Sequence, residues 1–284
     1  MASDSGRRGA PVTDAPRKPT SDTSVPGEPQ SGSEGRIGRE FYDSSAYFDD
    51  GGAVHLNDHE SRFQRYRIRK VLEIHTPGPH DRVIDLGCGW GTFGFALADR
   101  TGEVLGIDFS ERSIELCNAR LAKDHRPNLR FLCADAGETG LEPESADLVI
   151  AADLFEHLYP DDSARIAVEA FRILKPGGHF STWTPHRGHF LEMLKNRDIV
   201  LKRDVSHVDY KSMARMKALL DHVGFEIEKA YYAESHLPGL RFIERALQEQ
   251  IPWLRRRIAV LGRKPRSRGA ERPPGDPVAR EGQG

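Results

Sequence analysis

The stretch "VIDLGCGWGTFG", from Val83 to Gly94, decides the fold of this chain. A run of branched apolar residues around Asp85 predicts a buried strand, and the glycines that follow predict a loop whose bare backbone approaches a ligand closely. The next residues, 92–100, have the pattern of a helix. A strand, a glycine loop and a helix in this order predict a ligand site at the carboxyl edge of a parallel sheet.

Outward from this stretch, strand and helix patterns alternate, which predicts an α/β fold with helices on both faces of a parallel sheet. The expected strands are 82–86, 103–108, 129–135, 146–153, 179–185, 225–233 and 256–262. The expected helices are 57–75, 92–100, 111–123, 161–174 and 212–223. The expected amino-terminal caps are Asn57, Ser110, Asp161 and Asp162, and Gly224 is the expected carboxyl-terminal cap of the last helix. The residues "KPGG" are expected to end the fourth helix.

The composition predicts one globular domain between two polar ends. With 284 residues, of which 38% are hydrophobic, the chain has enough apolar material for one core. Residues 1–36 and 266–284 contain too few apolar side chains to offset the entropy of ordering, and we expect both to be disordered tails. The domain is therefore expected at 37–265.

Charge and cysteine content restrict the classes of function. The chain has 41 basic and 43 acidic residues, and this balance gives no electrostatic reason to expect a nucleic-acid partner. The three cysteines are odd in number and lie in expected elements or in the glycine loop, which favours a reducing compartment. No apolar run approaches the roughly 20 residues that span a bilayer, and polar residues follow Met1. We expect a cytoplasmic protein.

Acidic residues recur where successive strands are expected to end: Asp85, Asp108, Asp135 and Asp153. Because ligands of open α/β sheets bind at that edge, these carboxylates are expected to face one crevice. Asp108 follows the glycine loop by about 20 residues, the spacing at which dinucleotide folds place an acid on ribose hydroxyls. The expected ligand therefore contains adenosine.

Two cofactor types compete for the glycine loop. Gly89-x-Gly91-x-x-Gly94 matches the dinucleotide fingerprint, whereas Asp85-x-Gly87-x-Gly89-x-Gly91 matches a different motif. In a dinucleotide site the first glycine follows the strand directly, and here that glycine is Gly87, which gives the second spacing. An acid before the loop also suits a cationic ligand with an ammonium and a sulfonium group better than a pyrophosphate.

Five segments together resemble the class I S-adenosylmethionine-dependent methyltransferases. They are "VIDLGCGWG", "GIDFS", "CADA", "DLVIAADLFEHL" and "ILKPGGHF", and the resemblance covers about 41–265. It implies a Rossmann-like, seven-stranded, mostly parallel sheet whose last strand runs antiparallel, with "FEIEKAYYA" and "RRIAVLG" as the closing pair. It also implies S-adenosyl-L-methionine as the cofactor.

The resemblance assigns roles to residues of this chain. The glycines of the loop, Gly87, Gly89 and Gly91, would approach the methionyl part of the cofactor, and Asp85 would lie near its amino group. Asp108 would accept from both ribose hydroxyls, and Phe109 would face the adenine ring. Asp135 would accept a hydrogen bond from the adenine amino group. The start "FYDSSAYF" resembles an N-terminal lid, expected at 37–56, with Tyr42 and Tyr47 as contacts. The predicted cofactor residues are Tyr42, Asp85, Gly87, Gly89, Gly91, Asp108, Phe109, Asp135, Ala136 and Asp153.

The chemistry needs little from the protein beyond alignment of the acceptor and exclusion of water, because the sulfonium already activates the methyl group. A hydroxyl acceptor benefits from a base, for which histidine is suited by its near-neutral pKa. The candidates are His157, His186 and His207, and the predicted catalytic residues are His157, His207 and Glu156. The insertion 185–211 mixes apolar and polar side chains, as small-molecule pockets do, and is expected to cover the acceptor side.

Alternatives remain open at this point. The D-x-x-E-H pattern at 153–157 resembles the metal-contacting segment of ubiquinone-biosynthesis O-methyltransferases, but Asp153 replaces their first glutamate, and no metal is predicted. "GCGWG" and "FEH" also occur in cyclopropane-fatty-acid synthases, where the glutamate helps to hold bicarbonate, although their "HYD" signature is missing here. The acceptor is therefore expected to be a small molecule or lipid-like, with oxygen weakly favoured. A lipid-directed C-methyltransferase, an NAD(P)-dependent oxidoreductase and a non-catalytic adenosine-binding module are the alternatives.

The basic segment "WLRRRIAVLGRK", 253–264, has two interpretations. It could be a helix on a membrane surface, but an edge strand over 255–264 followed by a solvated tail fits the pattern better. Membrane association is therefore not expected. The sequence does not indicate an oligomeric state.

Overall fold

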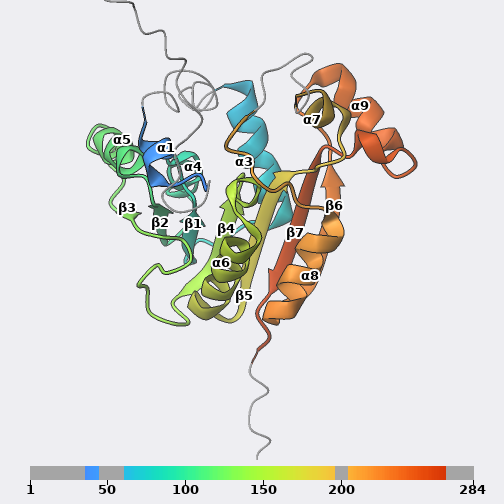
Figure 1. Cartoon of the computed structure of the whole chain (residues 1–284). Helices are drawn as coiled ribbons and strands as arrows, with labels where there is room; N and C mark the ends of the chain where they lie inside the picture. The colour runs from blue at the N-terminus through green and yellow to red at the C-terminus, as the bar shows by residue number, and fades with distance from the viewer. Residues whose placement is uncertain (1–35, 45–60, 196–203, 267–284) are drawn as a thin grey trace, which may run out of the picture. The chain divides into compact units, whose positions relative to one another are not determined.

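The computed structural model describes residues 36–44, 61–195 and 204–266. The chain divides into Met1–Arg36 and Ile37–Gly284, and the account below concerns the second unit. Its described part is built on a seven-stranded sheet with the order β3-β2-β1-β4-β5-β7-β6 (Figure 1). The strands are β1 Arg82–Leu86, β2 Glu103–Asp108, β3 Leu129–Cys133, β4 Ala146–Ala152, β5 Leu174–Pro185, β6 Glu226–Ala233 and β7 Arg257–Arg263.

Helices cover both faces of the sheet, as the alternating pattern predicts. They are α1 Arg39–Asp43, α3 Arg62–Ile74, α4 Thr92–Leu97, α5 Glu111–Leu121, α6 Pro160–Ile173, α7 Phe190–Lys195, α8 Met213–Val223 and α9 Pro238–Leu247, with short 3-10 turns η2 Phe155–His157 and η3 Pro252–Leu254. α6 and α8 lie in front of the sheet in Figure 1 and form one apolar core with it. α3 and α4 contribute to a second core. The interiors of β1, β2, β4 and β7 are buried on both sides, which explains their nearly continuous apolar sequence, whereas the edge strands β3 and β6 are partly exposed.

The strand directions confirm the predicted sheet. β1 pairs in parallel with β2 and β4, and β4 pairs in parallel with β5. β7 runs antiparallel to both β5 and β6. β6 and β7 are therefore the expected closing pair. The prediction of an edge strand at 255–264 was wrong, because β7 lies between β5 and β6 and the edge is β6.

Several predicted element ends are confirmed and others are corrected. The Ser110 hydroxyl accepts from the Ser113 N–H at 3.1 Å, and Gly224 ends α8 with a φ of 108°. α3 begins after Ser61, whose hydroxyl caps it, whereas Asn57 lies outside the described residues. Tyr159, which makes no side-chain cap, precedes α6 in place of the predicted aspartates, because Pro160 suits the first helical position.

The sequence interpretation also missed elements. The "KPGG" residues were expected to end the fourth helix. In the structure α6 already ends at Ile173, and the "KPGG" residues belong to β5. The pairing of β5 with β4 shifts register at this point. The short helices α1 and α7 and the longer α9 were not predicted. α7 lies inside 185–211, so that segment is not irregular throughout.

A buried ion-pair cluster connects three elements at the carboxyl edge of the sheet. Asp153 directly follows β4 with a φ of 55°, a left-handed conformation that is uncommon for a residue with a side chain. Its carboxylate lies 2.8 Å from the Arg67 guanidinium of α3 and 2.5 Å from that of Arg257 on β7. Burial alone would raise the pKa of Asp153, but Arg257 and Arg67 hold it below its ordinary value. The cluster thus fixes α3 and β7 to the turn after β4.

We expect Asp153→Ala to destabilise the fold by about 3–5 kcal/mol, because it leaves two mostly buried guanidinium groups without their shared carboxylate. Chemical denaturation measures the change. The matched control is Asp135→Ala, which removes a half-exposed ion pair with Arg165 and should cost about 1 kcal/mol or less. Equal losses in the two variants would contradict a structural role for the cluster.

Candidate active site

The glycine loop between β1 and α4 has a backbone shape that needs glycine. Gly87, Gly89 and Gly91 all have positive φ values, of 68°, 50° and 71°. The N–H groups of Gly87 and Cys88 donate to the Ile107 carbonyl at 2.8 and 3.0 Å, which attaches the loop to the end of β2. The loop is therefore held by backbone bonds while its other side stays available to a ligand.

The surroundings of the three glycines differ. A Cβ atom at Gly87 would lie 2.7 Å from Leu154, and one at Gly91 would lie 2.7 Å from Phe131, so both positions face packed side chains. A Cβ atom at Gly89 would meet none of the described residues within 4 Å. Gly89 thus faces open space, and a side chain there would fill the volume that a bound cofactor needs.

Asp108 lies at the end of β2 and is oriented by the glycine loop. Its carboxylate accepts from the N–H of Gly89 and from the N–H of Ser110, each at 2.9 Å. Burial raises the pKa of Asp108, although these two backbone hydrogen bonds oppose the rise. Each carboxylate oxygen has a second lone pair, so the group can also accept from a pair of hydroxyls beside Gly89.

Asp85 is a buried carboxyl with an unused acceptor. It is 1% exposed, and its Oδ2 has no hydrogen-bond partner among the described residues. Burial raises its pKa to about 7, Arg67 opposes this rise and Asp108 adds to it. A buried, unsatisfied carboxyl beside a glycine loop suits a ligand that brings its own donor, such as an ammonium group.

Tyr42 and Phe109 form an aromatic pair over the end of β2. Their ring centroids are 5.1 Å apart, and the Tyr42 ring also lies 6.0 Å from the His157 ring. α1 is attached here because the Ser110 hydroxyl donates to Asp43 at 2.6 Å. Tyr42 therefore connects the expected adenine side to the expected acceptor side. Tyr47 and the rest of the predicted lid, 45–56, lie outside the described residues.

Asp135, the third predicted strand-end acid, is the most exposed of the four. Its carboxylate accepts from the Gly137 N–H at 2.7 Å and pairs with Arg165 of α6 at 2.9 Å. Ala136 follows it and packs partly against the α6 and α8 core. A role for either residue on an adenine ring stays a prediction.

The turn η2 brings Glu156 and His157 to the same edge, against residues 204–209. The Glu156 carbonyl accepts from the N–H groups of Val208 and Asp209, and His157 Nδ1 lies 3.1 Å from the Ser206 carbonyl. A carbonyl only accepts, so Nδ1 carries the proton and the lone pair of the neutral ring is on Nε2. That tautomer is the one that a general base needs.

Glu156 is buried, and its carboxyl accepts from the Thr184 hydroxyl at 2.9 Å. Burial and the nearby Asp153 raise its pKa to about 8, so the group holds its proton near neutral pH. The ligand atoms of Glu156, His157 and His207 all lie within 4.8 Å of one another, an arrangement that could hold a metal ion. Asp153 is already taken by two arginines and is not part of this group.

His207 belongs to a hydrogen-bonded chain that leads away from the sheet edge. Its Nδ1 lies 2.8 Å from the Tyr210 hydroxyl, which donates to Glu192 at 3.2 Å, and Glu192 pairs with Arg256 at 2.6 Å. Asp204 lies 3.5 Å from His207 Nε2. The ring centroids of His207 and His157 are 4.8 Å apart.

His186, the third histidine considered, lies elsewhere. Its Nδ1 is 3.1 Å from the Arg255 carbonyl, and its ring packs against Tyr232. Burial lowers its pKa below the ordinary value. The sequence interpretation missed Arg67, Arg257 and Thr184, which carry no motif and become visible only through their contacts with the strand-end acids.

The chain is similar to known methyltransferases. Residues 83–178 match the family described as "Methyltransferase domain". A probable S-adenosylmethionine-dependent methyltransferase of Mycolicibacterium smegmatis is 32% identical over 58% of this chain and 60% of its own length. A ubiquinone biosynthesis O-methyltransferase of Leptothrix cholodnii is 33% identical over 51% of this chain and 65% of its own length. The chain thus spans less than two thirds of each curated relative.

Solved structures share the fold. A phosphoethanolamine N-methyltransferase 2 of Haemonchus contortus in complex with S-adenosyl-L-methionine is 20% identical with a TM-score of 0.61, over 80% of this chain and 60% of that one. A SAM-dependent methyltransferase of Archaeoglobus fulgidus is 19% identical with a TM-score of 0.56, over 75% of this chain and all of that one. Residues 83–178 therefore match a methyltransferase domain, and the chain shares the fold of solved S-adenosylmethionine-dependent methyltransferases. Among the described residues, no helix combines the length and apolarity that crossing a bilayer requires.

The raised pKa of Asp85 predicts a pH dependence of stability. The folded carboxyl keeps its proton up to about pH 7, whereas an unfolded one loses it near 3.8, so the folded state binds more protons between these values. The contribution of Asp85 to stability therefore falls as the pH rises through this window. Asp85→Asn cannot ionise, and we expect its melting temperature to rise relative to wild type between about pH 5 and about pH 8.

Melting curves at several pH values measure this difference. The control is Asp147→Asn. Asp147 lies near the amino end of β4, away from the candidate site, and its wild-type carboxylate accepts a hydrogen bond from Lys175 at 2.8 Å. A pH-independent difference between wild type and Asp85→Asn would show that Asp85 is ionised in the folded protein throughout this range.

Proposed function

We propose that this protein transfers the methyl group of S-adenosyl-L-methionine to a hydroxyl of a small-molecule acceptor, with His157 as the general base. The observation that carries the proposal is the aromatic chain at the carboxyl edge. Phe109 at the end of β2 packs against Tyr42, which packs against His157 on η2. The expected cofactor side and the expected base thus lie within two ring contacts of each other.

The residues present fit the cofactor. Open space at Gly89 leaves room for it, the unsatisfied Oδ2 of Asp85 suits its amino group, and Asp108 suits its ribose hydroxyls. When bound, the cofactor supplies an activated methyl group on a sulfonium. The chain's task is then to align the acceptor oxygen, exclude water and remove the proton of the hydroxyl.

His157 is the better base of the two histidines at this edge. Its Nδ1–H bond to the Ser206 carbonyl places the ring lone pair on Nε2. Both ring nitrogens of His207 face partners, with Nε2 3.5 Å from Asp204 and Nδ1 2.8 Å from the Tyr210 hydroxyl, so His207 suits a positioning role. Glu156 keeps its own proton near pH 7, because its pKa is raised to about 8, and therefore does not act as a base there. Its carboxyl accepts from the Thr184 hydroxyl, which connects the turn η2 to β5.

The ubiquinone biosynthesis O-methyltransferases among the curated relatives support an oxygen acceptor, whereas a phosphoethanolamine N-methyltransferase of Triticum aestivum, 33% identical, acts on nitrogen. The segments "GCGWG" and "FEH" favour a second candidate, a lipid-directed C-methyltransferase resembling cyclopropane synthases. The free state of Cys88, Cys117 and Cys133 supports action in a reducing compartment such as the cytoplasm.

Cofactor affinity tests the first half of the proposal. Asp108→Ala removes charge-assisted hydrogen bonds to the ribose and should weaken binding of S-adenosylhomocysteine at least about tenfold by titration calorimetry. Gly89→Val should do as much, because it fills the open space beside the loop. Asp147→Asn is the control and should bind normally. Normal binding in both site variants would place the cofactor elsewhere, and tight nicotinamide-dinucleotide binding would favour an oxidoreductase.

Turnover tests the second half. Metabolite extracts incubated with methyl-labelled cofactor identify the acceptor, and His157→Gln should then lower turnover by roughly 10²–10⁴ while S-adenosylhomocysteine binding stays near wild type. His207→Gln should have a smaller effect and retain the pH profile. Label on an acyl-chain carbon would replace the proposal with the lipid-directed candidate. Cofactor binding without any labelled product would favour a non-catalytic module.

A further inference from the structure

The helix α9 turns polar side chains toward the domain and apolar side chains outward, the reverse of a core helix. Its inward side carries Glu244, which is fully buried and accepts from the Ser235 N–H and, at 2.9 Å, from His189 Nε2. His189 is also fully buried, and Arg256 lies 3.3 Å from its Nδ1. Buried polar groups of this kind hold an element in place when they are satisfied. α9 is thus attached to the domain largely through polar contacts.

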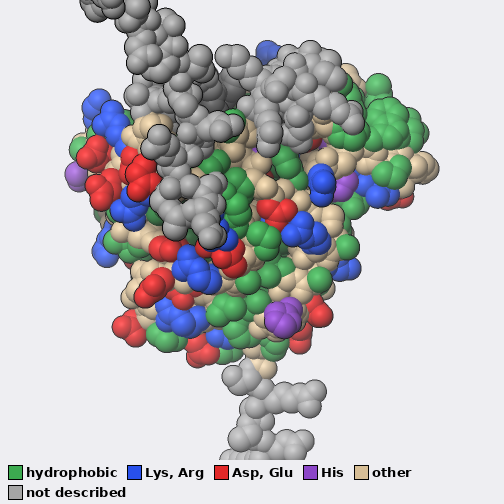
Figure 2. Space-filling model, in the orientation of Figure 1, with side chains coloured by type: hydrophobic (Ala, Val, Ile, Leu, Met, Phe, Trp, Pro, Cys, Tyr) green, Lys and Arg blue, Asp and Glu red, His purple; other side chains and the backbone are tan. Residues whose placement is uncertain are grey.

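The outward side of α9 is apolar. Phe242 is 62% exposed, Ile243 51% and Leu247 41%, and positions 242, 243, 246 and 247 form one stripe along the helix. Leu237, 40% exposed, precedes the helix, and Trp253, 50% exposed, follows it in η3. Figure 2 shows apolar side chains gathered at the upper right, where Figure 1 places α9. Grouped exposure of this kind marks an interaction surface, whereas single exposed apolar residues do not.

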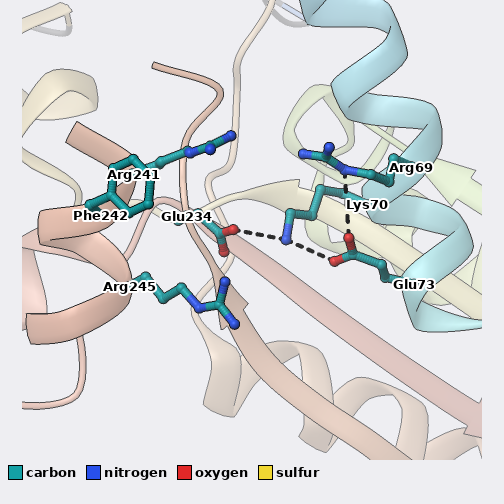
Figure 3. Close-up of a pocket in the computed structure, with 7 residues that line it drawn as sticks. All are labelled: Arg69, Lys70, Glu73, Glu234, Arg241, Phe242 and Arg245. Atoms are coloured by element: carbon teal, nitrogen blue, oxygen red, sulfur yellow. Dashed lines mark hydrogen bonds and ion pairs between the residues drawn. The ribbon is translucent and has the colours of Figure 1, made fainter. Parts of the chain in front are cut away.

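A basic pocket borders this apolar surface. It has a volume of about 260 Å³ and is lined by Arg69, Lys70, Glu73, Glu234, Arg241, Phe242 and Arg245 (Figure 3). Lys70 pairs with Glu73 at 2.7 Å and with Glu234 at 2.9 Å, which uses both acids of the pocket.

The two arginines of α9 give the pocket its excess positive charge. Arg241 and Arg245 are one helical turn apart and point into the pocket in Figure 3. In the part of the chain that the structure describes, neither has a carboxylate within the 4 Å of an ion pair. Four cations thus face two carboxylates, and the two surplus guanidinium groups suit an anionic group such as a phosphate.

We propose that the outward side of α9 and the bordering basic pocket dock the protein on an anionic lipid bilayer. Phe242 and Ile243 would lie at the boundary between headgroups and acyl chains, and Arg241 and Arg245 would bind lipid phosphate. Exposed apolar and aromatic side chains flanked by arginines match this environment, because a bilayer surface offers negative charge directly above an apolar phase. Trp253 suits the same interface, since indole rings favour that depth.

The proposal differs from the expectation that the protein does not associate with membranes. That expectation rested on 253–264, most of which is η3 and the buried strand β7, and it overlooked α9. The proposal does not rest on the identity of the methyl acceptor, so its failure would leave the proposed methyl transfer untouched.

Sedimentation of the full chain with lipid vesicles tests the proposal. We expect binding to phosphatidylcholine vesicles that contain about 30% phosphatidylglycerol, weak binding to phosphatidylcholine alone, and loss of binding at high salt. Phe242→Ser with Ile243→Ser, and separately Arg241→Gln with Arg245→Gln, should each weaken vesicle binding about tenfold or more. Both double variants should bind S-adenosylhomocysteine as wild type does.

Matched controls lie elsewhere on the surface. Val168→Ser on α6 removes another side chain that is more than half exposed, and Arg100→Gln with Lys217→Gln removes two exposed cations. Both controls should bind vesicles as wild type does. Equal loss in test and control variants, or no binding to anionic vesicles, would overturn the proposal. So would self-association that Phe242→Ser abolishes, or binding of inorganic phosphate in the pocket without any binding of vesicles.

Discussion

The shared ion pair of Asp153 with Arg67 and Arg257 is the interaction on which the candidate site depends. It fixes the left-handed turn after β4, and that turn leads directly into η2 with Glu156 and His157. α3 and β7 supply the two guanidinium groups from opposite ends of the domain sequence. Arg67 lies 86 residues before Asp153 in the sequence, and Arg257 lies 104 residues after it. The position of the proposed base therefore depends on charges that are distant in sequence.

Three carboxyl groups near this edge differ because their surroundings differ. Asp153 faces two arginines, and its pKa is lowered. Asp85 has an acceptor without a partner among the described residues, and burial raises its pKa to about 7, whereas burial and the nearby charge of Asp153 raise the pKa of Glu156 to about 8. The first group stabilises the fold, the second is suited to a cationic ligand, and the third stays neutral. Residue type alone does not separate these roles, because all three are mostly buried acids at one sheet edge.

The two halves of the crevice are built in different ways. The proposed cofactor half consists of strand ends and their following loops, so Gly89 and Asp108 are close because parallel strands end together. The proposed acceptor half is assembled from η2 and residues 204–209, with the chain from His207 through Tyr210 and Glu192 extending toward α7 and β7. α9 is held nearby through Glu244 and His189, which frees its apolar side for contact with another phase.

By itself, the sequence determined the alternating α/β order, the glycine loop and the Ser110 and Gly224 caps, whereas the antiparallel closing pair followed only from the family resemblance. These features depend on short-range patterns: periodicity, backbone freedom at glycine and side-chain bonds to nearby N–H groups. Only the tertiary structure decided that β7 is internal, that Asp153 lies between two arginines and that α9 turns its apolar side outward. The physical reason is that burial and charge pairing arise between residues distant in sequence, and a local pattern does not record which side of an element will be covered.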